Sequence, residues 1–266
     1  MKLQFRLITS LVALMLVCSC GCIDLDLDFD FAAFANPTVE PEKAKTQMAL
    51  YGSYFVSEVP ESKKIDDSLF KLANTMFHVG KAGDGFPDGF LRVASVVIKA
   101  DGEMHVDDFE EFFFATKIGD SYVLNIPAPK ETDNEIAEDL DQVLNELDSD
   151  EEPREKVVQW KPENYEGYML VVLKPTQVGF ALHYINADRL KAEMKAGRLS
   201  GDYMTKEEKD EYKKKEKLAK KEGKKIEDTW RPLMVTASPR ELRVFFEKRL
   251  DNAIEPQPFM LFKPVK

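Results

Sequence analysis

The chain has 266 residues, a formal net charge of −11 and 44% hydrophobic residues, among them 18 Phe. This length allows one large or two small domains, and the aromatic content can supply a packed core. Nucleic-acid binding requires a basic surface that neutralises phosphates, so the acidic balance argues against a nucleic-acid partner. Because all 3 Cys lie in the first 22 residues, the rest of the chain has no disulfide.

The first 19 residues have the layout of a secretory signal peptide. Lys2 and Arg6 give a positive start, and an almost unbroken apolar run follows at residues 7–17. The run is shorter than the roughly 20 residues that a membrane-spanning helix needs. We therefore predict a signal peptide over residues 1–19, removed on secretion.

The residues at the end of this run resemble the lipobox of bacterial membrane lipoproteins. Val17, Cys18 and Ser19 supply an aliphatic, a tolerant and a small position before Cys20. The resemblance implies cleavage before Cys20 and acyl chains such as palmitate on its thiol. Several such chains hold a protein firmly, and the body would then lie outside the cytoplasm at the cell envelope. Cys22 is the alternative lipidation site.

Residues 20–45 read as a lipidated tether, and residues 46–266 as a single domain. In the tether, Asp24, Asp26 and Asp28 alternate with apolar residues. This spacing also occurs in calcium loops, but Phe29 stands where such a loop needs Gly. The pattern therefore favours a spacer over a calcium site.

The first half of the domain contains the clearest β-strand signals. We predict a strand entry over residues 47–58, a short helix over 68–79, a loop over 81–89 and a strand over 90–100. Asp101-Gly102 is a hairpin signal, and Gly119-Asp120 joins two further strands at residues 111–118 and 122–126. Pro127 and Pro129 are expected to end the pairing there.

Two charged segments follow, of opposite sign. Residues 131–156 predict an acidic helix, in which Glu131–Glu155 contains 12 acidic residues. Residues 203–229 predict an exposed lysine-rich helical insertion, in which Lys206–Lys225 contains 10 Lys and 6 acidic residues. Each segment is either a solvated face or a docking surface for a protein partner, the acidic one can instead bind divalent cations, and the two can also pair with each other.

The second half repeats the alternation of strands and helices. Residues 167–174 and 178–185 predict an antiparallel pair. Asp188 is expected to cap a helix that ends at Gly197. A short strand at residues 232–236 comes before a helix that begins at Ser238, with Pro239 and Glu241 as supporting signals. Residues 259–262 form the last predicted strand.

These elements predict an α+β fold with a mainly antiparallel sheet that can curl into a barrel, with peripheral helices. The second half also resembles an uncharacterised bacterial lipoprotein domain. The resemblance rests on the stretch from Asp188 through Gly197 to Gly201 and on the Ser238-Pro239 helix start. It implies a fold and no assigned activity.

Residues that carry chemistry are sparse. His78, His105 and His183 are far apart and lack metal-ligand spacing, so we predict no metal, no cofactor and no catalytic residue. A glycosidase pair could lie among four neighbouring carboxylates, but these more plausibly cover a polar face before a strand. They are Asp107, Asp108, Glu110 and Glu111.

Consecutive aromatic residues in the same region bear on function. Phe112, Phe113 and Phe114 must point to both faces of a sheet. Either both faces are covered, or one offers an apolar surface to a ligand or partner. The leading hypothesis is a lipid-anchored, non-enzymatic binding or assembly module. The alternatives are a carrier that binds an apolar ligand in a barrel, and an envelope hydrolase.

Overall fold

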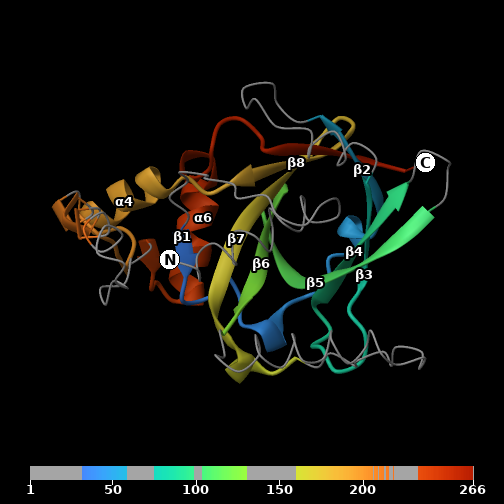
Figure 1. Cartoon of the computed structure of the whole chain (residues 1–266), viewed down its shortest axis with the longest axis horizontal. Helices are drawn as coiled ribbons and strands as arrows, with labels where there is room; N and C mark the ends of the chain where they lie inside the picture. Colours follow the sequence, from blue (N-terminus) through green and yellow to red (C-terminus); the bar gives the residue numbers. More distant parts are fainter. Residues whose placement is uncertain are drawn as a thin grey trace.

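The computed structural model describes residues 32–58, 75–98, 104–130, 160–205 and 233–265, together with scattered residues between 207 and 218. Eight strands form an antiparallel barrel, in the order β6-β5-β4-β3-β2-β11-β8-β7, and the pairing of β6 with β7 closes it. Figure 1 shows the strands labelled β2 to β8 arranged as a ring. The barrel strands are β2 Gly52–Glu58, β3 Thr75–Lys81, β4 Phe90–Ile98, β5 Met104–Ile118, β6 Ser121–Pro129, β7 Tyr165–Thr176, β8 Gly179–Tyr184 and β11 Met260–Pro264.

A second layer lies against one side of the barrel. In it, β1 (Ala32–Phe34) pairs with β7, β10 (Leu233–Val235) runs parallel to β1, and β9 (Gly201–Asp202) pairs with β10. The helices α4 (Ala187–Lys195) and α6 (Pro239–Ala253) lie on the same side, next to β7 (Figure 1). Three short 3-10 helices complete the described elements: η2 Pro41–Lys43, η3 Met48–Leu50 and η4 Pro162–Asn164.

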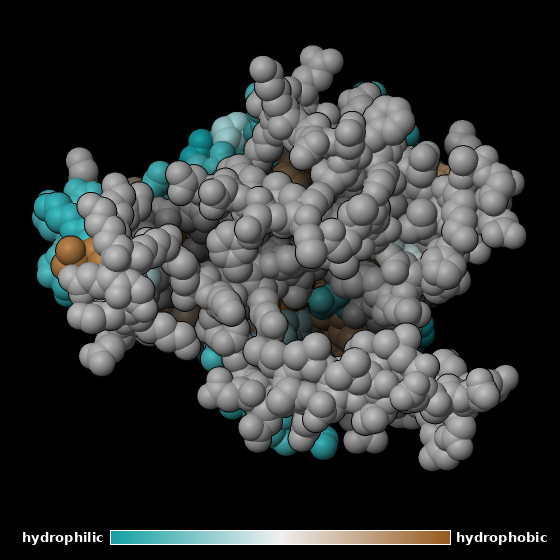
Figure 2. Space-filling view, viewed as in Figure 1, coloured by the Kyte–Doolittle hydropathy of each residue, from teal (hydrophilic) through white to brown (hydrophobic). Residues whose placement is uncertain are grey.

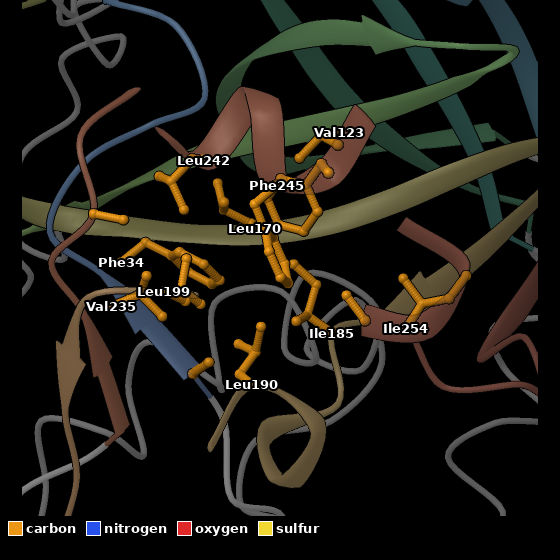
Figure 3. Close-up of a cluster of buried hydrophobic side chains, with 14 of the residues drawn as sticks. Phe34, Val123, Leu170, Ile185, Leu190, Leu199, Val235, Leu242, Phe245 and Ile254 are labelled. Carbon is orange, nitrogen blue, oxygen red and sulfur yellow. The ribbon is translucent and has the colours of Figure 1, made fainter. Parts of the chain in front are cut away.

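Side chains alternate along the strands and divide between two large cores, beside a smaller cluster of Ala82, Phe90 and Phe114. The inner core fills the barrel; it includes Leu124 of β6 and Val171 of β7. The outer core lies between the barrel and the second layer, and it takes the intervening residues Val123 and Val172 from the same two strands (Figure 3). The strand β6 is therefore buried on both faces along almost its whole length.

Two glycines lie where the chain turns sharply between two strands or where two neighbouring strands come very close. Gly119, with φ 60°, lies in the turn between β5 and β6, as its Gly-Asp signal predicts. At Gly179, with φ 151°, a Cβ atom would lie 1.9 Å from the carbonyl oxygen of Phe262. A side chain there would separate β8 from β11 and open the ring.

Several sequence predictions are confirmed. The strand pairs β4–β5, β5–β6 and β7–β8 are antiparallel neighbours, and residues 233–235 and 260–264 form strands. The helix α6 begins with a complete capping box between Ser238 and Glu241. Gly197 follows the end of α4 with φ 67°, as a C-terminal glycine should.

The helix predicted over residues 68–79 is wrong where the structure describes it. Thr75–Lys81 forms β3, between β2 and β4, and residues 68–74 lie outside the described part. The apparent helical face at Met76 and Val79 is instead a strand, in which Phe77 is buried in the inner core. The apolar residues of this short run fit both a helical and a strand period, and the pairing of β3 with β2 and β4 makes it a strand.

Two local predictions also need correction. The N-cap of α4 is Asn186, whose side chain accepts a hydrogen bond from the backbone N–H of Arg189 at 2.8 Å; Asp188 lies in the first turn. Pro127 and Pro129 do not end the pairing, because both pair with β7. The pairing of β6 with β5 ends at Asn125. Beyond that residue, the prolines therefore remove no backbone hydrogen bond between β6 and β5.

The folded body begins earlier than the predicted boundary at residue 46. Phe34 is fully buried in the outer core. The backbone N–H of Thr38 donates to Asn125 Oδ1 at 2.7 Å, and its hydroxyl lies 2.7 Å from that of Thr116. Residues 32–45 of the predicted tether therefore lie on the barrel.

The antiparallel barrel is confirmed, and the balance within the predicted α+β class is more strongly β than we expected. The acidic helix at residues 131–156 lies outside the described residues. Most of the lysine-rich segment at 203–229 does as well, although its described residues between 207 and 218 are helical.

A candidate binding cavity in the barrel

The barrel interior contains a cavity of about 90 Å³. Every one of the eight barrel strands contributes to its wall, and η3 adds Leu50. An eight-stranded barrel is just wide enough either to be filled by its side chains or to hold one small ligand. The residues that line the cavity are Leu50, Tyr54, Phe77, Val79, Val93, Glu111, Phe112, Phe113, Leu124, Ile126, Val171, Leu173, Phe180, Leu182 and Phe262.

The lining is apolar and aromatic because the strands turn alternate residues inward, although β5 contributes the consecutive residues Glu111, Phe112 and Phe113. Along β6 these are Leu124 and Ile126, and along β7 they are Val171 and Leu173. Two ring pairs stiffen the wall: Tyr54 with Phe180, and Phe77 with Phe262, with centroids 5.9 and 6.0 Å apart. In Figure 2, apolar residues of the described part are visible next to hydrophilic ones near the centre of the view.

Among the described residues of the lining, Glu111 alone carries a carboxyl group. Glu111 pairs with Val93 on β4, and Leu91 pairs with Phe113 in the same register. Because Val93, Leu91 and Phe113 belong to the inner core, this register turns Glu111 inward too. The prediction that Glu111 covers a polar face before a strand is therefore wrong: β5 begins at Met104, and Glu111 lies within it.

Burial in this apolar wall raises the pKa of Glu111 to about 7, against the opposing effect of a backbone hydrogen bond from Phe112. Within the described part of the chain, no lysine, arginine or histidine forms an ion pair with Glu111. The carboxyl is thus poised between its charged and neutral forms near neutral pH. Such perturbed groups in cavities mark candidate functional sites.

The tyrosines near this carboxyl stay neutral at physiological pH. The hydroxyl of Tyr54 donates to backbone oxygens of Leu50, at 3.1 Å, and Tyr51, at 3.3 Å. Burial raises the pKa of Tyr54, and burial together with the negative charge of Glu111 raises that of Tyr165. The ring of Tyr165 stacks on Trp160, 4.6 Å away.

The other carboxylates of the predicted glycosidase group are not placed with Glu111 by any described contact. Asp107, Asp108 and Glu110 lie in β5, but their side chains lie outside the described part of the structure, as does that of His105. The candidate lipidation residues Cys20 and Cys22 also lie outside it. The described residues contain no group of three or more residues that could hold a metal ion.

One serine and one histidine do meet. Ser53 Oγ lies 3.0 Å from His78 Nδ1, on neighbouring strands. Both residues lie on the outer face, where His78 is exposed and Ser53 half-buried, since Tyr54 and Phe77 beside them point inward. In a serine-hydrolase triad the nitrogen facing the serine is Nε2, and Nδ1 is held by a carboxylate. The pair is therefore a hydrogen bond across two strands.

His183 lies on the outer face of β8 and is almost fully buried. Its Nδ1 is 2.9 Å from the carbonyl oxygen of Glu255, which follows α6. Burial lowers the pKa of His183. This contact ties β8 to the chain after α6 and gives the residue a structural role.

The fold and the cavity define a class: an antiparallel barrel with a small interior whose described lining is apolar apart from one carboxyl group. Comparison of the chain with protein-family models, curated proteins and solved structures finds no match. Among the described residues, no helix is both long and apolar enough to cross a membrane.

Proposed function

We propose that the barrel is a binding module that holds a small, mostly apolar molecule in its interior, as a carrier does. The cavity carries this proposal, because its wall is built from all eight strands and is apolar apart from Glu111. An apolar cavity of about 150 Å³ admits benzene. In proportion, a cavity of about 90 Å³ admits a segment of roughly four carbon atoms.

The carrier hypothesis now stands ahead of the alternatives. A docking module would rest on the charged segments 131–156 and 203–229, which lie wholly or mostly outside the described residues. A hydrolase would need a base directed at a nucleophile in a cleft, and Ser53 with His78 occupies an exposed strand face. The cavity needs neither feature.

The location of this module is a further part of the proposal. The signal-peptide layout and Val17-Cys18-Ser19-Cys20 support a lipid anchor on Cys20 that holds the barrel at the bacterial cell envelope. The mass of the mature N-terminal peptide tests this part separately. A diacylated peptide that begins at Cys20 is expected, and an unmodified chain that begins beyond residue 22 would contradict it.

Binding is tested by filling the cavity. Val171 and Leu173 line it, so Val171→Phe and Leu173→Phe place a ring in the space that a ligand needs. Val244, on α6, is 40% exposed, and Val244→Phe adds the same ring outside the cavity. Methyl NMR of the full-length protein, titrated with butan-1-ol as the probe, is the measurement.

We expect butan-1-ol to shift the methyl signals of Val171 and Leu124 in the wild-type protein and in Val244→Phe, with matching saturation. The two cavity-filling variants should lose this binding while keeping a cooperative unfolding transition. If either folded variant binds as the wild type does, the cavity is not the site. If no cavity methyl of the wild-type protein responds, the carrier proposal fails.

A further inference from the structure

The described wall of the cavity contains one group that can distinguish ligands by their charge. Fourteen of its lining residues carry no charge in the neutral pH range, and the remaining one is Glu111. An apolar wall by itself favours the alkane over an alcohol, an acid or an amine of equal length, because each polar group loses its hydration on entry. A carboxyl group in that wall changes this order, because it repels a carboxylate and attracts a cation.

The Glu111 carboxylate lacks a compensating cation within the described residues. A buried charge without a partner is costly, so the group either takes up a proton or finds a positive partner. Its raised pKa reflects that cost in the empty cavity. A ligand that brings a positive charge removes the cost and forms a charge-assisted hydrogen bond at the same time.

No other described group in the wall competes for this role. The hydroxyl of Tyr54 already donates its proton to a backbone oxygen. The pKa values of Tyr54 and Tyr165 are raised, so both hydroxyls stay neutral. The backbone N–H of Phe112 occupies part of the accepting capacity of the carboxylate, which has two oxygens and several acceptor positions.

Building on the proposed carrier function, we infer that the ligand is a small amphiphilic amine, with a short apolar chain or ring in the cavity and a protonated amino group on the Glu111 carboxylate. The selectivity is then set by one side chain of β5, and the affinity for the apolar part is set by the rest of the wall.

The experiment compares three probes with the same chain: n-butylamine, butan-1-ol and butyrate. They are titrated at pH 8 into the full-length wild-type protein, Glu111→Gln and Glu166→Gln, with the cavity methyl signals as the readout. Glu166 is an exposed residue of β7, so its variant makes the same chemical change outside the cavity.

We expect the wild-type protein to bind n-butylamine about 10-fold or more tighter than butan-1-ol, as a hydrogen bond to a charged group allows, with butyrate weakest. Glu111→Gln should lose this margin for the amine and keep its affinity for the alcohol. Glu166→Gln should behave as the wild type does. Lowering the pH from 8 to 5 should weaken amine binding by the wild type, since the carboxyl takes up a proton.

Equal binding of the amine and the alcohol by the wild type, or undiminished amine binding by Glu111→Gln, would overturn the amine inference and leave the carrier function standing. Amine binding by the wild type that is unchanged between pH 8 and pH 5 would overturn it without any variant. If no probe moves the cavity methyl signals, the carrier function itself fails.

Discussion

The two faces of β6 and β7 meet two different cores. On the outer face, Val123, Val172 and Leu170 pack against β1, α4 and α6 in a core where many side chains are fully buried (Figure 3). On the inner face, Leu124 and Val171 border a cavity. Along each of these strands, successive side chains therefore face the closely packed outer core and the cavity alternately.

This difference indicates how a barrel can keep an incompletely filled interior. Empty space in a core lowers stability, because the lining atoms lose contacts that packing would give them. Here the second layer adds a separate buried core, which includes Phe34, Phe246 and Leu242. We infer that the outer core supplies stability that the inner face gives up for binding.

The strongest test of this comparison is Phe246→Ala. Phe246 is fully buried in α6 against the barrel, so its truncation should cost about 3–5 kcal/mol in the free energy of unfolding. Urea unfolding measures it, and Val244→Ala at the exposed position of the same helix should change stability by less than about 0.5 kcal/mol. A loss below about 1 kcal/mol for Phe246→Ala would show that the outer core does not carry this stability.

The sequence was sufficient for the local parts of this arrangement. Gly119-Asp120 predicted the β5–β6 turn, and Ser238 with Glu241 predicted the start of α6, because turns and caps depend on a few neighbouring residues. Closure of the barrel depends instead on the pairing of Tyr54 with Pro264 and of Tyr122 with Leu173. No local pattern specifies pairs so far apart along the chain.

The cavity and its carboxyl could be predicted only in part. Glu111 shares the parity of Phe113 and Ala115 in a strand, so the sequence alone places the three on one face. The opposite face carries Phe112 and Phe114, and both sets are apolar enough to be buried. Pairing with β4 decides which face lies inside: Phe113 joins the inner core, and Phe114 packs outside on Phe90.

A finer test uses two adjacent valines of β7 that are both fully buried. Val172→Leu inserts a methylene group into the outer core and should cost about 1–3 kcal/mol through overpacking. Val171→Leu directs the same addition toward the cavity, so it should change stability by less than about 1 kcal/mol and weaken butan-1-ol binding. Urea unfolding and the NMR titration measure both effects. The reverse order of stability would contradict the assignment of open space to the inner face.

The smallest expected effect is the pH dependence that Glu111 contributes to stability. Burial raises its pKa to about 7 in the folded state, so between the unfolded value and pH 7 the folded protein binds more protons than the unfolded chain. Stability from this group is therefore present at low pH and lost as pH rises through 7. At full strength the shift corresponds to about 3 kcal/mol, and partial exposure reduces it to roughly 1–2 kcal/mol.

Glu111→Gln cannot lose a proton, so it should gain this amount over the wild type between pH 5 and pH 8, measured by urea unfolding at both values. The other acidic residues and His183 are common to both proteins, and their contributions cancel in the difference. Glu166→Gln should follow the wild type, because its side chain is exposed. If Glu111→Gln and the wild type change in parallel with pH, the carboxyl is solvated, which would contradict its burial in the apolar wall of the cavity.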